Sequence, residues 1–356
     1  MKYALRQISL SFSIFFISCF VATQLYADVD HYKNMLVGER AATMGGTYVA
    51  ISDDSSGCYY NPAGIAYAVG DSLSGSGNVL HKMKTVYSET IGTEDWVRES
   101  ETLVPNYFGV LKKYKSYSFC FSYVVPEAFI EHQDLVFNDP LSTVKLYYES
   151  KKQREDGLMP KIGMQWSPWS LLTVGMALDQ TFLINATFQG DASIHNTDNS
   201  TGTASYTSLM TQNNSEEKRK FPLHLAFGAA YFPTPSLLYT VDLDYYKAQQ
   251  KGRADVINYS GGTEYYFDPT NAVRFGLFTN YTNLPQTDST TIAPYEYIDI
   301  YGASFGYTSY SSSSSLTLGA IYTSGSGKAW LYSGSTETRN MTRDSLTLLF
   351  SASSSL

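Results

Sequence analysis

Few residues of this 356-residue chain have types and spacings that could do chemistry. The sequence has no Ser/His/Asp arrangement, no glycine loop that leads into a helix and no paired carboxylates in a recognisable frame. The five histidines are scattered, and no CxxC pair or Cys/His cluster occurs. We therefore expect no metal, no cofactor and no enzyme activity. The groups that remain are suited to binding: two cations, one apolar stretch and two cysteines.

Lys161 and Arg274 are the cations best placed to bind a carboxylate head group. Each falls on the polar face of an alternating segment, and an ammonium or guanidinium forms strong charge-assisted hydrogen bonds to a carboxylate. Either cation could instead pair with acids that share the same polar surroundings, such as Asp242, Asp244 or Glu264. Both alternatives stay open from the sequence.

The segment 127–141 has the apolar content that a groove for a hydrophobic ligand needs. Its apolar side chains are Phe129, Ile130, Leu135, Val136 and Phe137. The alternative is that these side chains only pack the loop against the body of the protein.

The first 27 residues have the pattern of a secretory signal peptide. A basic start is followed by an apolar run over 8–21 and by an acceptable cleavage site after Ala27. Cleavage there leaves Cys58 and Cys120 in the mature chain, and an exported chain meets an oxidising compartment. A disulfide between them is a hypothesis, because the sequence does not give the distance between them.

Alternating apolar and polar residues dominate the rest of the chain, as in half-buried β-strands. The pattern is clearest in 116–125, 171–179, 223–231, 237–245 and 273–281. Aromatic residues make up 15% of the chain and charged residues only 16%, against about a quarter in ordinary soluble domains. A soluble sandwich would carry more Lys and Glu on its outer face. The sequence therefore predicts an all-β fold, a transmembrane antiparallel β-barrel with lipid on one side and a polar lumen on the other. The formal charge of −8 argues against a nucleic-acid partner.

Connections between the expected strands alternate in length, which is typical of outer-membrane barrels. Tight turns are expected at 113–115, 167–170, 233–235 and 268–271. Long loops are expected at 127–141, 186–220, 283–294 and 324–343. The pattern allows 12–14 strands. Either residues 142–166 form one long interrupted strand, which gives 12, or a further partner strand lies between 82 and 105, which gives 14.

The stretch from Arg40 to Ala66, RAATMGGTYVAISDDSSGCYYNPAGIA, is too polar and too rich in glycine to span a membrane. It ends in Asn61-Pro62-Ala63-Gly64, where proline fixes φ and asparagine favours a compact turn. This stretch resembles the N-terminal hatch of the FadL/TodX family of long-chain fatty-acid transporters, whose members carry a closely similar run. The resemblance favours 14 strands.

The resemblance implies three parts: a signal peptide (1–27), a hatch that plugs the lumen (28–71) and a barrel (72–356). It also implies passive diffusion of long-chain fatty acids or other hydrophobic small molecules across the bacterial outer membrane. Asn61, Pro62, Ala63 and Gly64 would gate a lateral exit. The expected partners are the hydrophobic ligand, outer-membrane lipid and the barrel-assembly machinery, and the chain is expected to be a monomer. The alternative is a FadL-like barrel that serves in secretion or surface binding without transporting small molecules.

Overall fold

The computed structural model describes residues 30–91, 94–115, 117–127, 132–138, 143–198, 203–215, 220–284, 295–330 and 338–355. Three short helices come first in these ranges: α2 (Glu39–Thr43), α3 (Gly57–Tyr60) and the 3-10 helix η2 (Gly64–Tyr67). Sixteen strands follow: β1 (Ser72–Ile91), β2 (Glu94–Tyr114), β3 (Tyr117–Val124), β4 (His132–Asn138), β5 (Thr143–Leu158), β6 (Lys161–Trp169), β7 (Leu172–Gln180), β8 (Phe182–Asp198), β9 (Thr203–Ser215), β10 (Leu223–Thr234), β11 (Leu237–Lys247), β12 (Val256–Asp268), β13 (Asn271–Asn280), β14 (Tyr295–Tyr310), β15 (Ser314–Trp330) and β16 (Arg339–Ser355). None of the described helices is long and apolar enough to cross a membrane.

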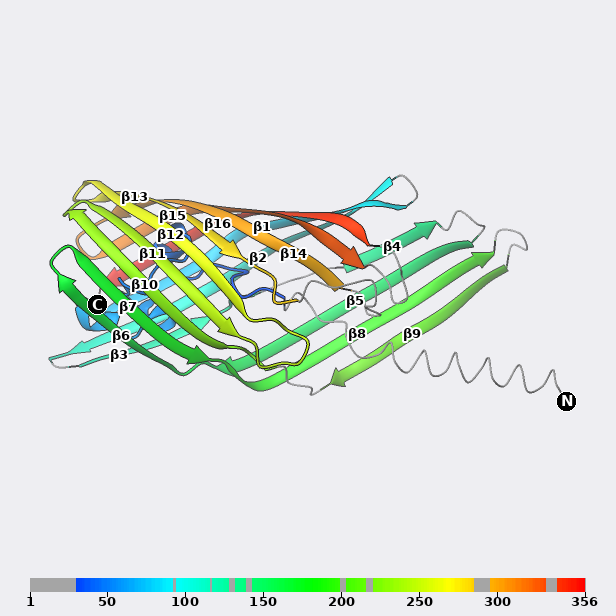
Figure 1. Cartoon of the computed structure of the whole chain (residues 1–356), viewed down its shortest axis with the longest axis horizontal. Helices are drawn as coiled ribbons and strands as arrows, with labels where there is room; N and C mark the ends of the chain where they lie inside the picture. The colour runs from blue at the N-terminus through cyan, green and yellow to red at the C-terminus, as the bar shows by residue number, and fades with distance from the viewer. Residues whose placement is uncertain are drawn as a thin grey trace.

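The strands pair antiparallel in two sheets. Twelve strands form the larger sheet in the order β3-β2-β1-β16-β15-β14-β13-β12-β11-β10-β7-β6. The smaller sheet has the order β4-β5-β8-β9 and extends beyond the larger one at the end away from the C-terminus (Figure 1). The first and last strands, β1 and β16, lie side by side, with Ser72 opposite Ser355.

At two places the chain passes from a strand of one sheet directly into a strand of the other. β5 leads into β6 across Met159 and Pro160, and β7 leads into β8 across Thr181. Taking each of these two pairs as one wall strand reduces the sixteen described segments to fourteen, the number that the family resemblance favours. β5 and β6 together form the long interrupted strand that the sequence allowed over 142–166, because Pro160 cannot donate a backbone hydrogen bond to a ladder.

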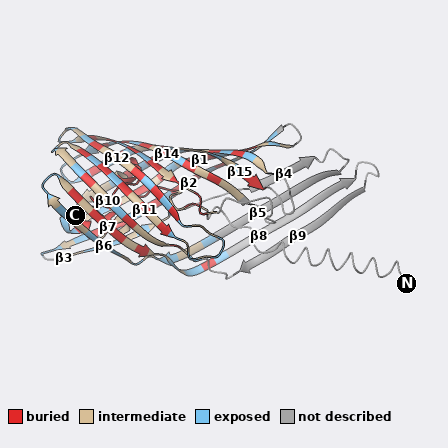
Figure 2. Ribbon diagram, viewed as in Figure 1, coloured by how far each residue is buried: buried red, intermediate tan, exposed pale blue. Residues whose placement is uncertain are grey.

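Side chains alternate across the wall as predicted. The apolar side chains of β3, β11 and β13 face outward, and 61% of Phe119, 59% of Val241 and 55% of Leu277 is exposed. The opposite face of the strands is polar and buried (Figure 2), with Asp242 only 4% and Arg274 only 1% exposed. Exposed apolar and buried polar residues are the reverse of a water-soluble domain, and they define a wall whose outer face meets lipid.

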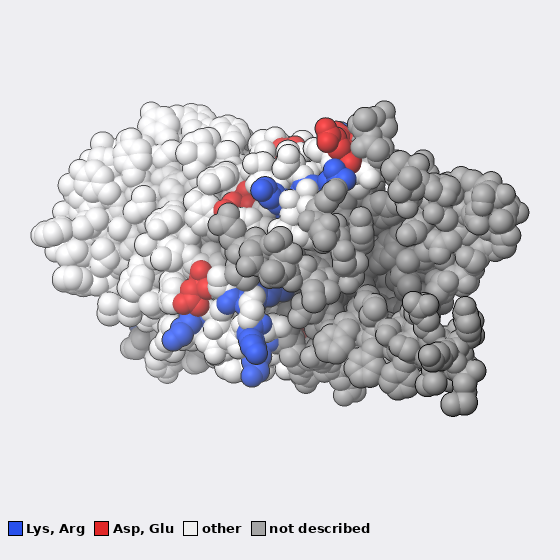
Figure 3. Space-filling model, turned by 45° about the vertical axis from the view of Figure 1, so that its right-hand side comes forward, with Lys and Arg blue, Asp and Glu red and all other residues white. Residues whose placement is uncertain are grey.

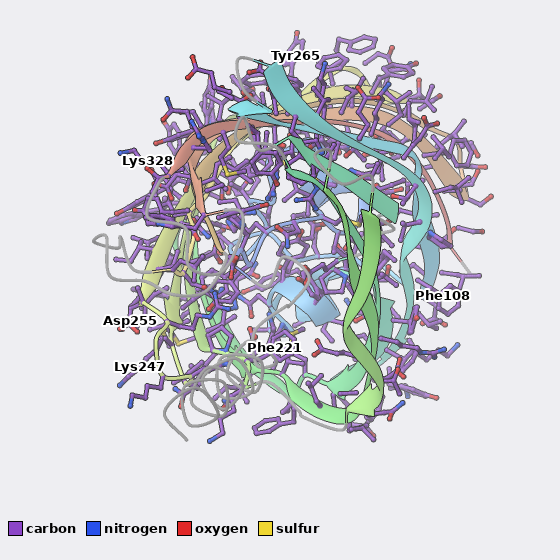
Figure 4. The ribbon with its side chains drawn as sticks, turned by 90° about the vertical axis from the view of Figure 1, so that its right-hand side faces the viewer. Phe108, Phe221, Lys247, Asp255, Tyr265 and Lys328 are labelled. Atoms are coloured by element: carbon purple, nitrogen blue, oxygen red, sulfur yellow. A yellow bond between two sulfur atoms is a disulfide. The ribbon has the colours of Figure 1, made fainter. Side chains whose placement is uncertain are left out.

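Charged side chains are scarce on the outer face. The space-filling view shows a broad uncharged surface over the strands, and the visible charges gather in a zone beside it (Figure 3). In the view along the barrel, the labelled Phe108 and Tyr265 lie on the outside of the ring of strands (Figure 4). This distribution matches the low charge of the sequence.

Three of the expected long loops contain strand residues. β4 lies inside 127–141, β8 and β9 occupy much of 186–220, and β15 and β16 extend into 324–343. The first two corrections have the same cause. Neither segment shows clean alternation, whereas the backbone of β4 pairs with β5 and that of β8 pairs with both β5 and β9. Backbone pairing with a neighbour, rather than side-chain pattern, determines the strands in this sheet.

The N-terminal segment, residues 30–71, lies against the inner face of the strands and is enclosed by them in the view along the barrel (Figure 4). Its backbone N–H groups at Tyr48 and Val49 donate to Asp242 Oδ2 at 2.6 and 3.0 Å. The N–H of Gly45 donates to Ser304 Oγ at 2.8 Å. Polar wall side chains therefore pair the backbone of a segment that has little regular structure of its own.

Glycines in the wall allow this close approach. A Cβ on Gly276 of β13 would lie 2.1 Å from the backbone nitrogen of Gly45. A Cβ on Gly175 of β7 would lie 2.2 Å from the carbonyl oxygen of Val49. No side chain fits at either position, so the wall and the N-terminal segment are in direct backbone contact.

Candidate functional site

β3 and β6 are the two ends of the larger sheet, so their facing edges are not paired with each other. β3 pairs only with β2 in the larger sheet, and β6 pairs only with β7. Unpaired edges leave backbone N–H and C=O groups that need other partners. The N-terminal segment provides contacts to both edges through α3 and the residues that follow it.

Asn61 contacts the β6 edge. Its buried side chain donates from Nδ2 to the carbonyl oxygen of Met164 at 3.0 Å and to that of Val49 at 2.7 Å. Its Oδ1 accepts from the N–H of Ala63 at 3.1 Å, which fixes the turn through Pro62. Asn61 therefore replaces the missing strand neighbour at one point of the edge and orders the Asn61–Gly64 turn.

Cys58 contacts the β3 edge. The structure brings Cys58 of α3 and Cys120 of β3 together as a disulfide, with Cα atoms 5.9 Å apart. Cys120 is on the inward face of β3, as its parity in the sequence predicts. The helix α3 is therefore held covalently on the β3 side and by non-covalent contacts, among them the Asn61 hydrogen bond, on the β6 side.

A cavity of about 170 Å³ lies on the other side of α3. Tyr59 and Tyr60 of α3 line it, and so does Val49, whose carbonyl accepts the Asn61 hydrogen bond. Residues 31–36 of the N-terminal segment, parts of β6, β7, β10 and β11, and residues that follow or precede strands supply most of the rest. The lining thus includes α3 and Lys161 of β6, one of the two strands with unpaired edges.

Five charged side chains form one connected cluster in the cavity lining. Lys161 Nζ lies 2.7 Å from Asp179 Oδ2. His224 bridges two carboxylates, with Nδ1 2.9 Å from Asp179 Oδ2 and Nε2 2.9 Å from Asp244 Oδ1. Lys33 of the N-terminal segment pairs with Asp244 and donates to Ser260 Oγ at 3.2 Å.

The cluster fixes the protonation of His224. A carboxylate only accepts hydrogen bonds, and a neutral imidazole has only one N–H to donate. Because both ring nitrogens face carboxylate oxygens at hydrogen-bond distance, both contacts are satisfied only by the imidazolium. The cluster then holds three cations and two anions, and its lysines and aspartates are less than 10% exposed.

Aromatic rings surround the cluster. The His224 imidazole stacks on Tyr246 with centroids 4.3 Å apart and planes 8° apart. Tyr246 in turn stacks on Tyr32 of the N-terminal segment at 4.5 Å. Lys161 Nζ lies 5.3 Å from the centroid of the Tyr59 ring, a favourable cation–π distance. The cavity thus combines aromatic walls with a buried, net positive cluster.

The two predicted cations have different surroundings. Lys161 lines the cavity. Arg274 is fully buried away from it, with Nη2 3.1 Å from Glu264 Oε1. Arg40 approaches the same Glu264 from the N-terminal segment, Nε donating at 2.7 Å. Arg274 is therefore occupied by one of the acids named as its alternative partner, whereas Lys161 pairs with Asp179.

The predicted apolar groove falls on residues that the structure describes only in part. Phe129 and Ile130 lie outside the described residues. Leu135, Val136 and Phe137 are in β4, where the backbone pairs with β5 and the side chains are not described. The groove stays a prediction.

Sequence reasoning missed His224 and Asp179 as members of a site, and it named Asp244 only as a possible partner of the predicted cations. The signal was present: each falls at an inward position of an alternating segment, and an imidazole between acids on neighbouring strands is unusual. What the sequence lacks is the register that places His224 opposite Asp179 and next to Asp244. In the described residues, no group of three or more His, Cys, Asp or Glu side chains could hold a metal ion.

Ionisable groups of the N-terminal segment are affected by their enclosure. Burial raises the pKa of Glu39, and the nearby charge of Asp54 raises it further. Arg274 and hydrogen bonds from Ser315 and Ser351 oppose this rise in the pKa. Burial also places the pKa of Tyr48 well above its ordinary value, so this phenol stays protonated and its single O–H is shared between Asp54 at 2.8 Å and Asp53 at 3.1 Å.

The wall and its enclosed segment define an outer-membrane β-barrel. No protein-family model and no curated protein matches the chain. The crystal structure of the Pseudomonas putida toluene transporter TodX matches with a TM-score of 0.56 and 11% identity, over 90% of this chain and 99% of TodX. The chain therefore has the fold of the FadL/TodX outer-membrane barrels that its hatch-like motif resembles.

Two further solved structures cover similar shares. A second TodX structure has a TM-score of 0.44 and 10% identity over 92% of this chain and 100% of that one. The Ralstonia pickettii toluene transporter TbuX has a TM-score of 0.42 and 11% identity over 90% of this chain and 98% of TbuX.

Proposed function

We propose that this protein carries hydrophobic small molecules, long-chain fatty acids among them, across the outer membrane by passive diffusion. The observation that carries the proposal is the position of α3. It lines the cavity with Tyr59 and Tyr60 and is bonded through Cys58 to β3, one of the two strands with unpaired edges. The description of TodX as a toluene transporter supports the same class of cargo.

In this proposal the cavity takes up the ligand and the gap between β3 and β6 releases it sideways into the membrane. A ligand gains about 0.8 kcal/mol for each CH₂ group that it removes from water. A lateral route keeps that gain, because the ligand never has to cross a water-filled pore. The exposed apolar side chains Phe119, Met164 and Trp166 on the outer faces of β3 and β6 suit such an exit.

The N-terminal segment is the gate in this proposal. Asn61, Pro62, Ala63 and Gly64 form the turn that contacts the β6 edge, and one hydrogen bond from Asn61 to Met164 is the direct link to that edge. Breaking this link costs little, since a neutral hydrogen bond contributes about 1 kcal/mol net. The disulfide to Cys120 would keep α3 attached while the turn moves.

Uptake by cells tests the proposal. A strain without its own hydrophobic-uptake barrel would express the wild type or a variant that lacks residues 30–71, and uptake of radiolabelled oleate and toluene would be measured. We expect faster uptake of at least one compound with the wild type than with an empty vector. Uptake at the vector rate for both compounds, with the barrel present in the outer membrane, would favour a secretion or surface-binding role.

A further inference from the structure

We propose that the cavity selects small aromatic acids, meaning a single ring that carries a carboxylate, over neutral hydrocarbons of the same size. This inference rests on the proposed function, because it names the ligand class of the same cavity. Three properties of the cavity support it: its size, its walls and its charge.

The size of the cavity suits a compact ligand. Its volume is about 170 Å³, close to the roughly 150 Å³ of an engineered protein cavity that binds one benzene molecule. A one-ring compound fills such a space, whereas most of a long alkyl chain would remain outside it. The size alone does not separate a neutral ring from a charged one.

The walls of the cavity suit an aromatic ring. Tyr59 and Tyr60 of α3 line it and meet edge to face, with centroids 5.0 Å apart. On the other side Tyr32, Tyr246 and His224 form a continuous stack. Aromatic rings favour offset-stacked or edge-to-face neighbours, so both walls offer surfaces of the right kind.

The charge of the cavity suits an anion. Lys33, Lys161 and the His224 imidazolium outnumber Asp179 and Asp244 in the buried cluster. Lys161 contacts one carboxylate and one ring, and Lys33 contacts one carboxylate and one hydroxyl. An ammonium has three N–H donors, so each lysine keeps one for a further acceptor.

The outer part of the lining leaves this positive balance unchanged. Lys220, Arg253 and Glu127 also line the cavity, and Arg253 pairs with Asp30. With these groups counted, cations still exceed anions. The aspartates therefore do not neutralise the cavity.

A neutral hydrocarbon makes poor use of this cluster. Filling the cavity with toluene removes water from the lysine N–H groups and gives them no acceptor in return, which is unfavourable. A carboxylate provides charge-assisted hydrogen bonds to the same groups. The buried cluster thus discriminates by charge, while the walls accept the ring in either case.

Direct binding of a matched ligand panel tests the inference. The purified full-length protein in lipid nanodiscs would be titrated with 4-methylbenzoate, toluene and oleate, with binding followed by calorimetry. We expect 4-methylbenzoate to bind at least tenfold more tightly than toluene. Equal or tighter binding of toluene or oleate would overturn the inference and leave the proposed function standing. If none of the three compounds binds, the result would count against both the selectivity for aromatic acids and the proposed transport function.

Two lysine variants locate the selectivity. Lys161→Met and Lys33→Met should each weaken 4-methylbenzoate binding at least tenfold and leave toluene binding unchanged or tighter. Lys328→Met removes an exposed lysine of β15 outside the cavity and should change neither affinity (Figure 4). Unchanged 4-methylbenzoate affinity in either cavity variant that keeps the folded, heat-modifiable barrel would contradict the assignment.

Discussion

The two sides of the N-terminal segment are held in very different ways. Toward β11–β13 it is fixed by backbone contact at Gly276, by Asp242 and by the buried Arg40–Glu264–Arg274 network. Toward β3 and β6 it is held by one disulfide, by the Asn61 hydrogen bond to Met164 and by the cation–π contact between Lys161 and Tyr59. The first side has no room for movement and several buried charges to keep paired. On the second side, release of β6 breaks one neutral hydrogen bond and one cation–π contact.

This difference indicates where the barrel is rigid and where it can open. A buried ion network is costly to break, because removing one partner leaves an uncompensated charge. A single neutral hydrogen bond is easily exchanged for one to water. The structure thus places its rigid anchor opposite the unpaired edges of β3 and β6.

Removing the shared acid of the anchor should have the largest effect. Glu264→Gln removes the carboxylate that faces the buried Arg274 and leaves Arg40 paired with Asp53, which should destabilise the protein by about 3–5 kcal/mol. Thermal unfolding of the purified barrel, followed by heat-modified gel mobility, would measure it. Glu99→Gln is the control, because Glu99 is half exposed and its lysine contacts are long. Equal melting temperatures for the two variants would contradict the anchor role.

Removing the disulfide should have the next largest effect. The double variant Cys58→Ser, Cys120→Ser opens a link across a sequence separation of 62 residues and should cost about 2–4 kcal/mol. Loss of the disulfide should expose α3 to protease, while the region around Arg40 on the other side of the N-terminal segment should stay protected. Limited proteolysis with mass spectrometry would locate the cuts. Cleavage that begins near Arg40 instead would reverse the assignment of fixed and movable sides.

Filling the backbone contact should have a moderate effect. Gly276→Ala adds a methyl group 2.1 Å from the Gly45 nitrogen, and such overpacking costs about 1–3 kcal/mol. Gly261→Ala is the matched control on the next strand, because its nearest contact lies at 3.9 Å. Thermal unfolding should separate the two variants clearly. If both tolerate the methyl group, the wall and the N-terminal segment are not in close contact in solution.

The smallest effect should be a change in pH dependence. Because the pKa of Glu39 is raised by burial, the folded protein binds this proton more tightly than the unfolded chain does. Its contribution to stability therefore falls as pH rises from the ordinary value of 4.5 through the raised one. Glu39→Gln should remove that fall and raise the melting temperature at neutral pH. If the melting temperatures of the wild type and the variant change in parallel between pH 4 and pH 8, Glu39 does not contribute to the pH dependence of stability.

The wall could be predicted from the sequence because alternation directly reports which side chains share a face. The inward positions of Cys120, Asp242 and Arg274 all follow from parity alone. β4, β8 and β9 were missed because pairing with neighbours, rather than alternation, makes them strands. The hatch-like motif indicated the fold that the comparison with TodX establishes.

The candidate site could be predicted only in part. Lys161 was identified as an inward cation, but Arg274 was assigned the same role although Glu264 and Arg40 enclose it. Alternation shows which face of the wall a side chain lies on, but it does not show how far along the barrel axis the residue lies or which residues of neighbouring strands are beside it. The bridging position of His224 depends on strand register, which no local pattern contains.

The central claim is that the Asn61 side moves away from β6 when cargo leaves. A Cβ on Gly163 would lie 1.9 Å from Asn61 Oδ1, so Asn61→Cys with Gly163→Cys is placed for a cross-link. The pair would be introduced with Cys58→Ser and Cys120→Ser, and uptake measured in proteoliposomes before and after reduction, with each single cysteine variant as control. We predict that the oxidised protein transports no cargo and that reduction restores uptake. Equal rates in the locked and reduced forms would contradict the account.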